Sequence, residues 1–269
     1  MPSWASTSRS AVVEGFEVGA ATDAGRVRPK NEDYVLWEIP EDPDLRTGRG
    51  ALLIVADGVG GHGGGAVASA EAAHTVVQEY YLHRRGDPGR ALRRALERAN
   101  LHVYTMRLGH PGLAGMQTTA TALAIADGRY WVAHVGDSKA WLLRGGMLLR
   151  LTRDHTIVEE MRRIGLVDQA RADRHSHRHL LTRTIGGDAI VRIDLSSGPV
   201  QDGDCFVLTT DGVHEHLSSE DVRDAFTNLP PPAAAAACVQ DANRRGGYDN
   251  LTVLGVRVGG RGGLDAGSG

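Results

Sequence analysis

The segment ALLIVADG (residues 51–58) places six apolar residues directly before an aspartate and a glycine. A short apolar run that ends at a turn signal predicts a buried strand. Asp57 would then lie at the end of that strand, where it is exposed enough to bind a ligand and is held rigidly by the sheet. Gly58 allows its backbone carbonyl to approach a cation with no side chain in the way.

Three further aspartates lie beside predicted strands: Asp137 follows YWVAHV (130–135) and one glycine, Asp211 follows CFVLTT (205–210), and Asp249 precedes LTVLGVRV (251–258). Four strand-end carboxylates in a chain with two cysteines favour oxygen ligation of Mg²⁺ or Mn²⁺ over zinc or copper. An aspartate-glycine pair after a strand is also a common turn, so the pattern alone leaves both interpretations open.

A charged loop adds to this pattern. The segment TDAGRVRPKNED (22–33) holds three acidic and three basic residues. Basic side chains beside a carboxylate-bound metal pair suit an anionic phosphate, which the metal polarises and a guanidinium holds by two oxygens. A solvated charged loop is the alternative.

The remaining pattern predicts an α+β protein with mostly antiparallel sheet. Helical periodicity covers Ala66–Tyr81 and Ala91–Met106, and further helices begin at Ser218 or Ser219 and near Pro230. Other strands are predicted at the following positions: Thr119–Ala126, Ala140–Leu143 and Cys205–Leu208. Hairpin turns are expected at 127–128 and 145–146.

Composition excludes several classes of protein. The chain has 269 residues and a net charge of −3, which argues against nucleic-acid and membrane-surface binding. No apolar run is long enough to span a bilayer and no signal peptide is evident, so a cytoplasmic protein is expected. Cys205 and Cys238 are predicted to be reduced core thiols. Residues 1–13 and 259–269 are predicted to be flexible.

Taken in order, eight segments resemble the metal-dependent serine/threonine protein phosphatases of the protein phosphatase 2C-like family, in a compact bacterial form. The segments are TDAGRVRPKNED (22–33), VADGVGGHGGGAVAS (55–69), TTATAL (118–123), HVGDSKAWL (134–142), RDHT (153–156), LTRTIGG (181–187), LTTDGVHEHLS (208–218) and DNLTVLGV (249–256). The resemblance implies a central antiparallel β-sandwich flanked by helices on both sides. It implies one catalytic domain over 14–258, with a flap at about 155–187 beside the active site.

The resemblance also implies which residues hold two tightly bound Mn²⁺ or Mg²⁺ ions. Asp57 would bridge both ions, the Gly58 carbonyl would join it at the second, and Asp211 and Asp249 would complete the first. Glu32 would act on the second ion through water.

Other site residues follow from the same resemblance. Asp33 would support the metal ligands, and Arg28 would bind phosphate. Asp137 would hold a weak third ion with Asp211, although it could simply be a turn residue. Asn250 would brace Asp249.

Two features depart from the family pattern. Val59 stands where animal relatives carry the histidine proposed as general acid, so the acid is unassigned and a metal-bound water is the leading candidate. His175, His177 and His179 alternate, and on a strand they would share one face and could chelate zinc. The favoured interpretation is a charged flap that contacts a phosphopeptide.

The expected activity is hydrolysis of phosphoserine and phosphothreonine in proteins by a water bridging two metal ions, by a monomer that reverses a bacterial serine/threonine kinase. The alternatives are a phosphatase of anti-sigma-antagonist regulators, a non-catalytic phosphoprotein-binding module on the same fold, and a metal-dependent nuclease. The nuclease is disfavoured by the acidic balance and by the lack of an aromatic, basic groove.

Overall fold

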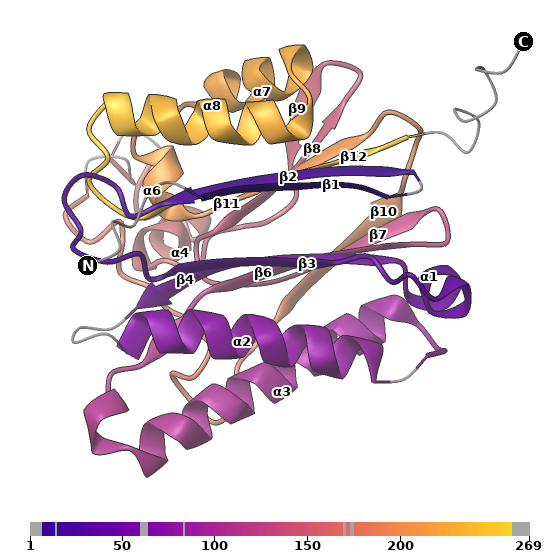
Figure 1. Cartoon of the computed structure of the whole chain (residues 1–269). Helices are drawn as coiled ribbons and strands as arrows, with labels where there is room; N and C mark the ends of the chain where they lie inside the picture. The colour runs from indigo at the N-terminus through magenta and orange to yellow at the C-terminus, as the bar shows by residue number, and fades with distance from the viewer. Residues whose placement is uncertain are drawn as a thin grey trace, which may run out of the picture.

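A computed structural model describes residues 7–13, 15–59, 64–82, 84–168, 171–172 and 175–259. Two antiparallel sheets stack face to face, and helices cover the outer side of each (Figure 1). The predicted α+β sandwich is therefore confirmed. None of the described helices combines the length and apolar character needed to cross a bilayer.

The first sheet has the strand order β1-β2-β12-β11-β8-β9. Its strands are β1 (Thr7–Val13), β2 (Phe16–Asp23), β12 (Leu251–Val258), β11 (Cys205–Thr209), β8 (Lys139–Arg144) and β9 (Met147–Arg150). The second sheet has the order β10-β7-β6-β4-β3, with β5 paired to the end of β4. Its strands are β10 (Asp194–Pro199), β7 (Arg129–Val135), β6 (Ala120–Ala126), β4 (Ala51–Val59), β3 (Asp33–Glu38) and β5 (Gln117–Thr118).

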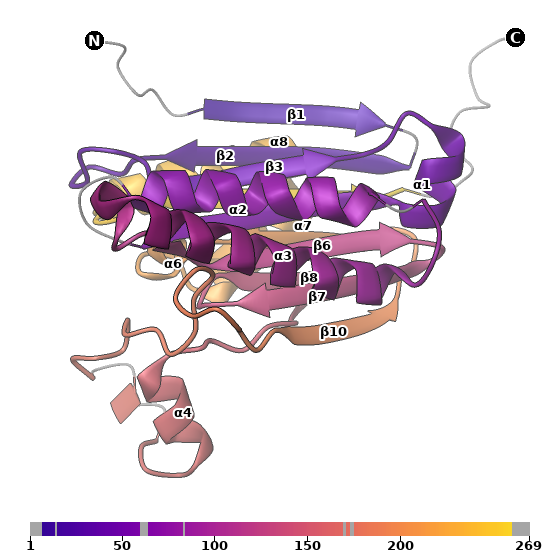
Figure 2. The ribbon, with the colours of Figure 1, turned by 90° about the horizontal axis from the view of Figure 1, so that it is seen from below.

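Two long helices, α2 (Gly64–Tyr81) and α3 (Pro88–Gly109), cover the second sheet, and α7 (Ser219–Asn228) and α8 (Pro231–Arg244) cover the first. The short elements are α1 (Pro43–Arg49), η2 (Pro111–Leu113), α4 (Ile157–Arg163) and α6 (Asp211–His214). In Figure 2, α4 lies to one side of the sheets, within the predicted flap.

Three apolar layers fill the spaces between these elements. Strand β4 shows how the sequence builds them, because Leu52 and Ile54 pack toward α2 and α3 while Leu53 and Val55 pack between the sheets. Both faces of the strand are buried, which is why ALLIVA is continuously apolar rather than alternating. The third layer lies between the first sheet and α7 and α8, and it buries Cys205 and Cys238. Burial raises the pKa of each thiol to about 12, as expected for unreactive core cysteines.

Two paired glycines bring α7 and α8 close to the first sheet. Gly19 of β2 lies opposite Gly255 of β12 in the antiparallel register. A Cβ atom at Gly19 would lie 2.2 Å from the backbone nitrogen of Pro232, and one at Gly255 would lie 2.2 Å from the ring of Phe226. The helices can therefore sit at this distance only because both positions lack a side chain.

Local sequence signals mark several element boundaries. Ser218 caps α7 in a capping box with Asp221, and Asp87 caps α3 by accepting a hydrogen bond from the Arg90 amide. The β6–β7 hairpin turns through Asp127, whose φ of 47° is the left-handed conformation that this type of turn requires.

The expected flexible segment 1–13 is wrong over Thr7–Val13, which forms β1 and pairs with β2 along its length. Arg9 in this strand stacks over the ring of Trp37, 5.5 Å from its centroid. The strand is mostly exposed at the edge of the sheet, so it carries few of the apolar residues that mark a strand. Residues 1–6 and 260–269 lie outside the described part of the chain.

Asn100 fixes a loop from inside the helical layer. Its side chain is buried on α3, where Nδ2 donates to the carbonyls of Asp188 and Ala189 at 3.0 and 3.2 Å, and Oδ1 accepts from the Gly186 amide at 2.8 Å. All the groups bonded to Asn100 belong to the segment that joins the flap to β10. A single buried amide therefore holds this segment against the helix.

We expect Asn100→Ala to lower the free energy of unfolding by about 1–3 kcal/mol, because it leaves buried polar groups unpaired. Amide hydrogen exchange should accelerate at residues 185–190 more than elsewhere. His102→Ala, which removes an exposed side chain of the same helix that pairs with Glu71, is the control and should change stability by less than about 0.5 kcal/mol. Equal destabilisation by both variants would contradict a specific role for Asn100.

Candidate metal centre

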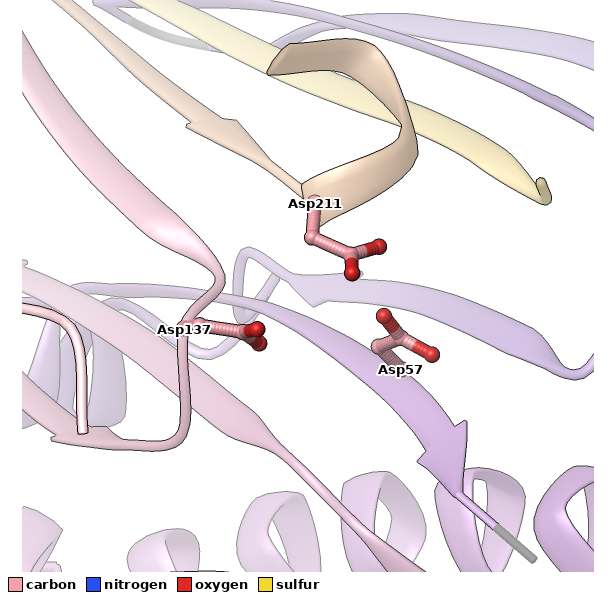
Figure 3. A group of neighbouring side chains, drawn as sticks. All are labelled: Asp57, Asp137 and Asp211. Atoms are coloured by element: carbon pink, nitrogen blue, oxygen red, sulfur yellow. The ribbon is translucent and has the colours of Figure 1, made fainter. Parts of the chain in front are cut away.

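Three carboxylates converge at one end of the sandwich (Figure 3). Asp57 comes from the end of β4, Asp137 from the turn between β7 and β8, and Asp211 from the first residue of α6 after β11. One carboxylate oxygen of each lies within 4.8 Å of those of the other two. Among the residues that the structure describes, this is the only such group of acidic, histidine or cysteine side chains.

Burial and mutual repulsion make this arrangement unfavourable for three free carboxylates. Desolvation first, and then repulsion by Asp211 and Asp33, raise the pKa of Asp57 well above its usual value. Desolvation and repulsion by Asp211 likewise raise the pKa of Asp137. Carboxylates packed in this way stay ionised at neutral pH when a cation lies among them. The residues present therefore fit a hard divalent cation.

Asp33 lies directly behind this group. It is paired with Asp57 across the β3–β4 ladder, and its Oδ2 accepts hydrogen bonds of 2.7 Å from the hydroxyls of Thr210 and Thr252. Its Oδ1 is buried without a hydrogen-bond partner, and burial raises the pKa of the carboxyl to about 7. An unpartnered acceptor beside the three carboxylates is consistent with the supporting role expected for Asp33.

Asp249 lies at the edge of the same cleft but outside the group of three. It forms an ion pair with Arg28, whose Nη2 is 2.6 Å from the aspartate Oδ2. This pairing and the nearby charges of Asp211 and Asp57 raise the pKa of Arg28. Both side chains line the cleft, which has a volume of about 1170 Å³. The structure thus places the predicted phosphate-binding arginine beside one predicted metal ligand.

Asn250 holds the charged loop in place. Its Oδ1 accepts from the Glu32 amide at 2.8 Å, and its Nδ2 donates to the carbonyls of Ala24 and Lys30 at 3.0 and 2.9 Å. Its own amide donates to Asp249 Oδ1 at 2.8 Å. The TDAGRVRPKNED segment is therefore a braced loop rather than the freely solvated one considered above.

Glu32 and Gly58 lie side by side in the cleft wall. The Gly58 amide donates to the Glu32 carbonyl at 3.2 Å. A Cβ atom at Gly58 would lie 2.3 Å from the Gly65 carbonyl oxygen and 2.6 Å from that of Glu32. The backbone path therefore requires glycine at this position.

A set of hydroxyl groups joins the strand ends, and sequence reasoning assigned these groups no role. The Thr119 hydroxyl lies 2.8 Å from that of Ser138 and accepts from the Asp57 amide at 2.9 Å. The Asp57 carbonyl accepts from the Thr119 amide at 2.8 Å. Thr119 and Ser138 thus connect the turns that carry Asp57 and Asp137. The sequence does carry a signal for Thr119 and Ser138. Hydroxyl residues gather in TTATAL and GDS, close to the strand-end aspartates.

His155 fixes the turn that carries Asp137. Its ring Nδ1 accepts from the Gly136 amide at 3.1 Å, and its own amide donates to the Gly136 carbonyl at 2.7 Å. The ring Nε2 lies 3.2 Å from an Asp194 oxygen. A buried histidine therefore holds both polar groups of Gly136, which has a φ of 113°.

The zinc-chelating alternative for the three flap histidines depends on a strand, and the structure has none there. Residues 176–179 form a turn, so alternation does not place the rings on one face. The rings of His175 and His177 lie 5.5 Å apart, whereas His179 faces Glu215 at 3.4 Å and lines the cleft. The geometry therefore gives no support to zinc chelation by these three side chains.

Comparison with known proteins gives consistent matches. Residues 31–242 match the family model described as protein phosphatase 2C. The protein phosphatase PhpP of Streptococcus pneumoniae is 33% identical over 244 residues, which cover 88% of this chain and 96% of that protein.

Solved structures agree with the sequence matches. The serine/threonine phosphatase PstP/Ppp of Mycobacterium tuberculosis superimposes with a TM-score of 0.82 at 31% identity, covering 91% of this chain and 99% of that one. A structure of the PstP catalytic domain in complex with 2 manganese ions superimposes with a TM-score of 0.79 at 31% identity, covering 91% and 99%.

The repulsion among the carboxylates of the site predicts how stability changes when one of their charges is removed. In EDTA, Asp57→Asn should raise the free energy of unfolding by about 1 kcal/mol, and the melting temperature by about 3 °C, because it removes one of the repelling buried charges. In millimolar Mn²⁺ the order should reverse, because the wild type is stabilised by the bound ion and the variant much less. Thermal melts in both buffers measure the effect.

Asp204→Asn is the control, since Asp204 is a buried aspartate whose charge is bonded to Arg144 at 2.6 Å instead of facing other carboxylates. It should destabilise the protein in both buffers. If Asp57→Asn lowers the melting temperature in EDTA, Asp57 stabilises the fold as Asp204 does, and the predicted relief of charge repulsion is wrong.

Proposed function

The chain belongs to the protein phosphatase 2C family and is a metal-dependent protein serine/threonine phosphatase, and we propose that the residues at the end of its sandwich hydrolyse phosphoserine and phosphothreonine with two Mn²⁺ or Mg²⁺ ions. The observation that carries this assignment is the convergence of Asp57, Asp137 and Asp211 in a cleft that also contains Arg28. Carboxylates alone suit a cation, but carboxylates beside a guanidinium suit a cation together with an anionic substrate.

We propose that Asp57 bridges the two ions, with the Gly58 carbonyl at the second and Asp211 and Asp249 at the first. Glu32 acts at the second ion through water, and Asp33 supports the ligands from behind. When bound, the ions lower the pKa of a shared water toward neutrality and thereby supply the nucleophile.

Basic residues of the charged loop bind the phosphate of the substrate. Arg28 has five N–H donors, of which one bonds to Asp249, so its guanidinium can also hold phosphate oxygens. Lys30 lines the same wall and adds positive charge. Because Asn250 fixes the backbone at Ala24 and Lys30, the guanidinium needs little reordering when substrate binds.

The physiological role follows from the chemistry. A phosphatase of this class removes phosphate that a serine/threonine kinase has added, so we propose that a bacterial kinase is the opposing partner. Anti-sigma-antagonist regulators are an alternative class of substrate. Hydrolysis of p-nitrophenyl phosphate and a phosphothreonine peptide in Mn²⁺, reversible loss in EDTA, and no cleavage of single-stranded DNA would support the proposal. Cleavage of DNA alone would contradict it.

Arg28→Ala should raise KM for phosphosubstrates by about tenfold, because a charge-assisted contact to phosphate is lost. The Mn²⁺ concentration for half-maximal activity should not rise, since Arg28 provides no ligand to the ion. Arg26→Ala is the control, because Arg26 is exposed in the same loop but does not line the cleft. An unchanged KM in Arg28→Ala would rule out the assigned role.

Asp137→Ala tests the third ion. We propose that Asp137 and Asp211 hold it mostly through water, at millimolar concentration. Calorimetric titration with Mn²⁺ should show loss of a weak binding phase while the tight phase persists, and turnover of phosphopeptides should fall. If every phase remains and the variant only melts at a lower temperature, Asp137 is a turn residue.

A further inference from the structure

The catalytic cleft carries exposed apolar side chains. Leu180 lines it from the flap, Ile190 from the segment between the flap and β10, and Val59 from the end of β4. Their exposed fractions are 48%, 89% and 38%. We call these three residues the apolar rim. Single exposed apolar residues are ordinary on a protein surface, but three beside a charged reaction centre call for an explanation.

Ile190 is the most informative member, because its neighbours show that the chain could have buried it. Ile185 and Ile193 on either side pack in the core, with exposed fractions of 0% and 9%. Of these three isoleucines, Ile190 alone is exposed, in a stretch where Asp188, Ala189 and Arg192 are exposed as well. The segment therefore turns a large apolar side chain to solvent between two isoleucines that anchor it in the core.

The backbone on the N-terminal side of Ile190 is held firmly. Asn100 bonds to Gly186, Asp188 and Ala189, as described above, and Ile185 exchanges two backbone hydrogen bonds with Thr118 at 3.1 and 2.7 Å. Gly186, with a φ of 83°, lies so close to α3 that a Cβ atom would be 2.3 Å from Val103. A side chain presented from such a fixed loop can bind a partner without a large loss of conformational entropy.

The chemistry of the cleft identifies the occupant. Four basic residues line the cleft together with Ile190: Arg28, Lys30, Arg183 and Arg192. Arg183 is already paired with Asp194 at 2.8 Å. An occupant must bring an anionic group to the centre and an apolar group to the rim. A phosphorylated polypeptide with a large apolar side chain near the phosphoresidue has both.

We infer that Ile190 is a specificity-determining residue, which contacts an apolar side chain flanking the phosphoserine or phosphothreonine of the substrate. This inference rests on the proposed function. It deepens that function by stating which phosphoproteins the cleft prefers. The contact requires no charge from the substrate besides its phosphate.

The test is a set of phosphothreonine peptides in which leucine, glutamate or serine occupies each flanking position in turn. The wild type should prefer leucine in at least one position by about fivefold in kcat/KM, which is the size expected for partial burial of one aliphatic side chain. Ile190→Ser should abolish that preference and Ile190→Leu should keep it. Hydrolysis of p-nitrophenyl phosphate, which has no flanking residue, should be equal in all three proteins.

Leu82→Ser is the matched control, because Leu82 is 65% exposed and lies outside the cleft. It should keep the leucine preference. Absence of any preference in the wild type, or its survival in Ile190→Ser, would overturn the inference while leaving the phosphatase activity intact. A preference for acidic flanking residues in both proteins would assign recognition to the arginines and overturn it as well. Failure of the wild type to hydrolyse any of these compounds in Mn²⁺ would instead contradict the proposed function.

Discussion

The repulsion among buried carboxylates is the constraint on which the active end of this protein depends. Asp57, Asp137 and Asp211 converge from separate strand ends, and Asp33 lies behind them. Desolvation first, and then repulsion by Asp211, raises the pKa of both Asp57 and Asp137. A flexible chain would relieve this repulsion by moving the side chains apart. Here the backbone prevents that movement, because Thr119, Ser138 and His155 tie the turns together. A divalent cation bound among these carboxylates would relieve the repulsion.

The layered fold supplies the rigidity that this constraint requires. Strands β4, β7 and β11 are buried by apolar layers on one or both faces, so their ends are well fixed. Antiparallel strands also bring residues far apart in the sequence to one edge, as the pairing of Asp33 with Asp57 shows. The repulsion among the carboxylates at the strand ends is thus offset by apolar packing along the rest of the same strands.

The sequence predicted the parts of this structure that have strong local signals. The apolar run of β4, the periodicity of α2 and α3 and the cap at Ser218 are local patterns, and so is each aspartate at a strand end. Strand β1 escaped prediction because an exposed edge strand carries little apolar pattern. Alternation in the histidine segment left a strand open as an alternative, whereas the chain turns at residues 176–179. The roles of Asn100 and His155 depend on partners about 86 and 19 residues away, respectively, which no window of local sequence contains.

The division of labour within the cleft follows from what the substrates share. Every phosphoprotein presents the same phosphate, so groups that contact only the phosphate cannot distinguish one protein from another. Discrimination must come from groups that contact the flanking chain, and it is sharper when those groups are held rigidly. The segment ending at Ile190 meets this condition, because the buried amide of Asn100 holds its backbone from the opposite side. Ile190, the proposed contact to the substrate, is exposed on the loop, whereas Asn100, which positions the loop backbone, is buried on α3. The exposed side chain can therefore change without disturbing the catalytic centre.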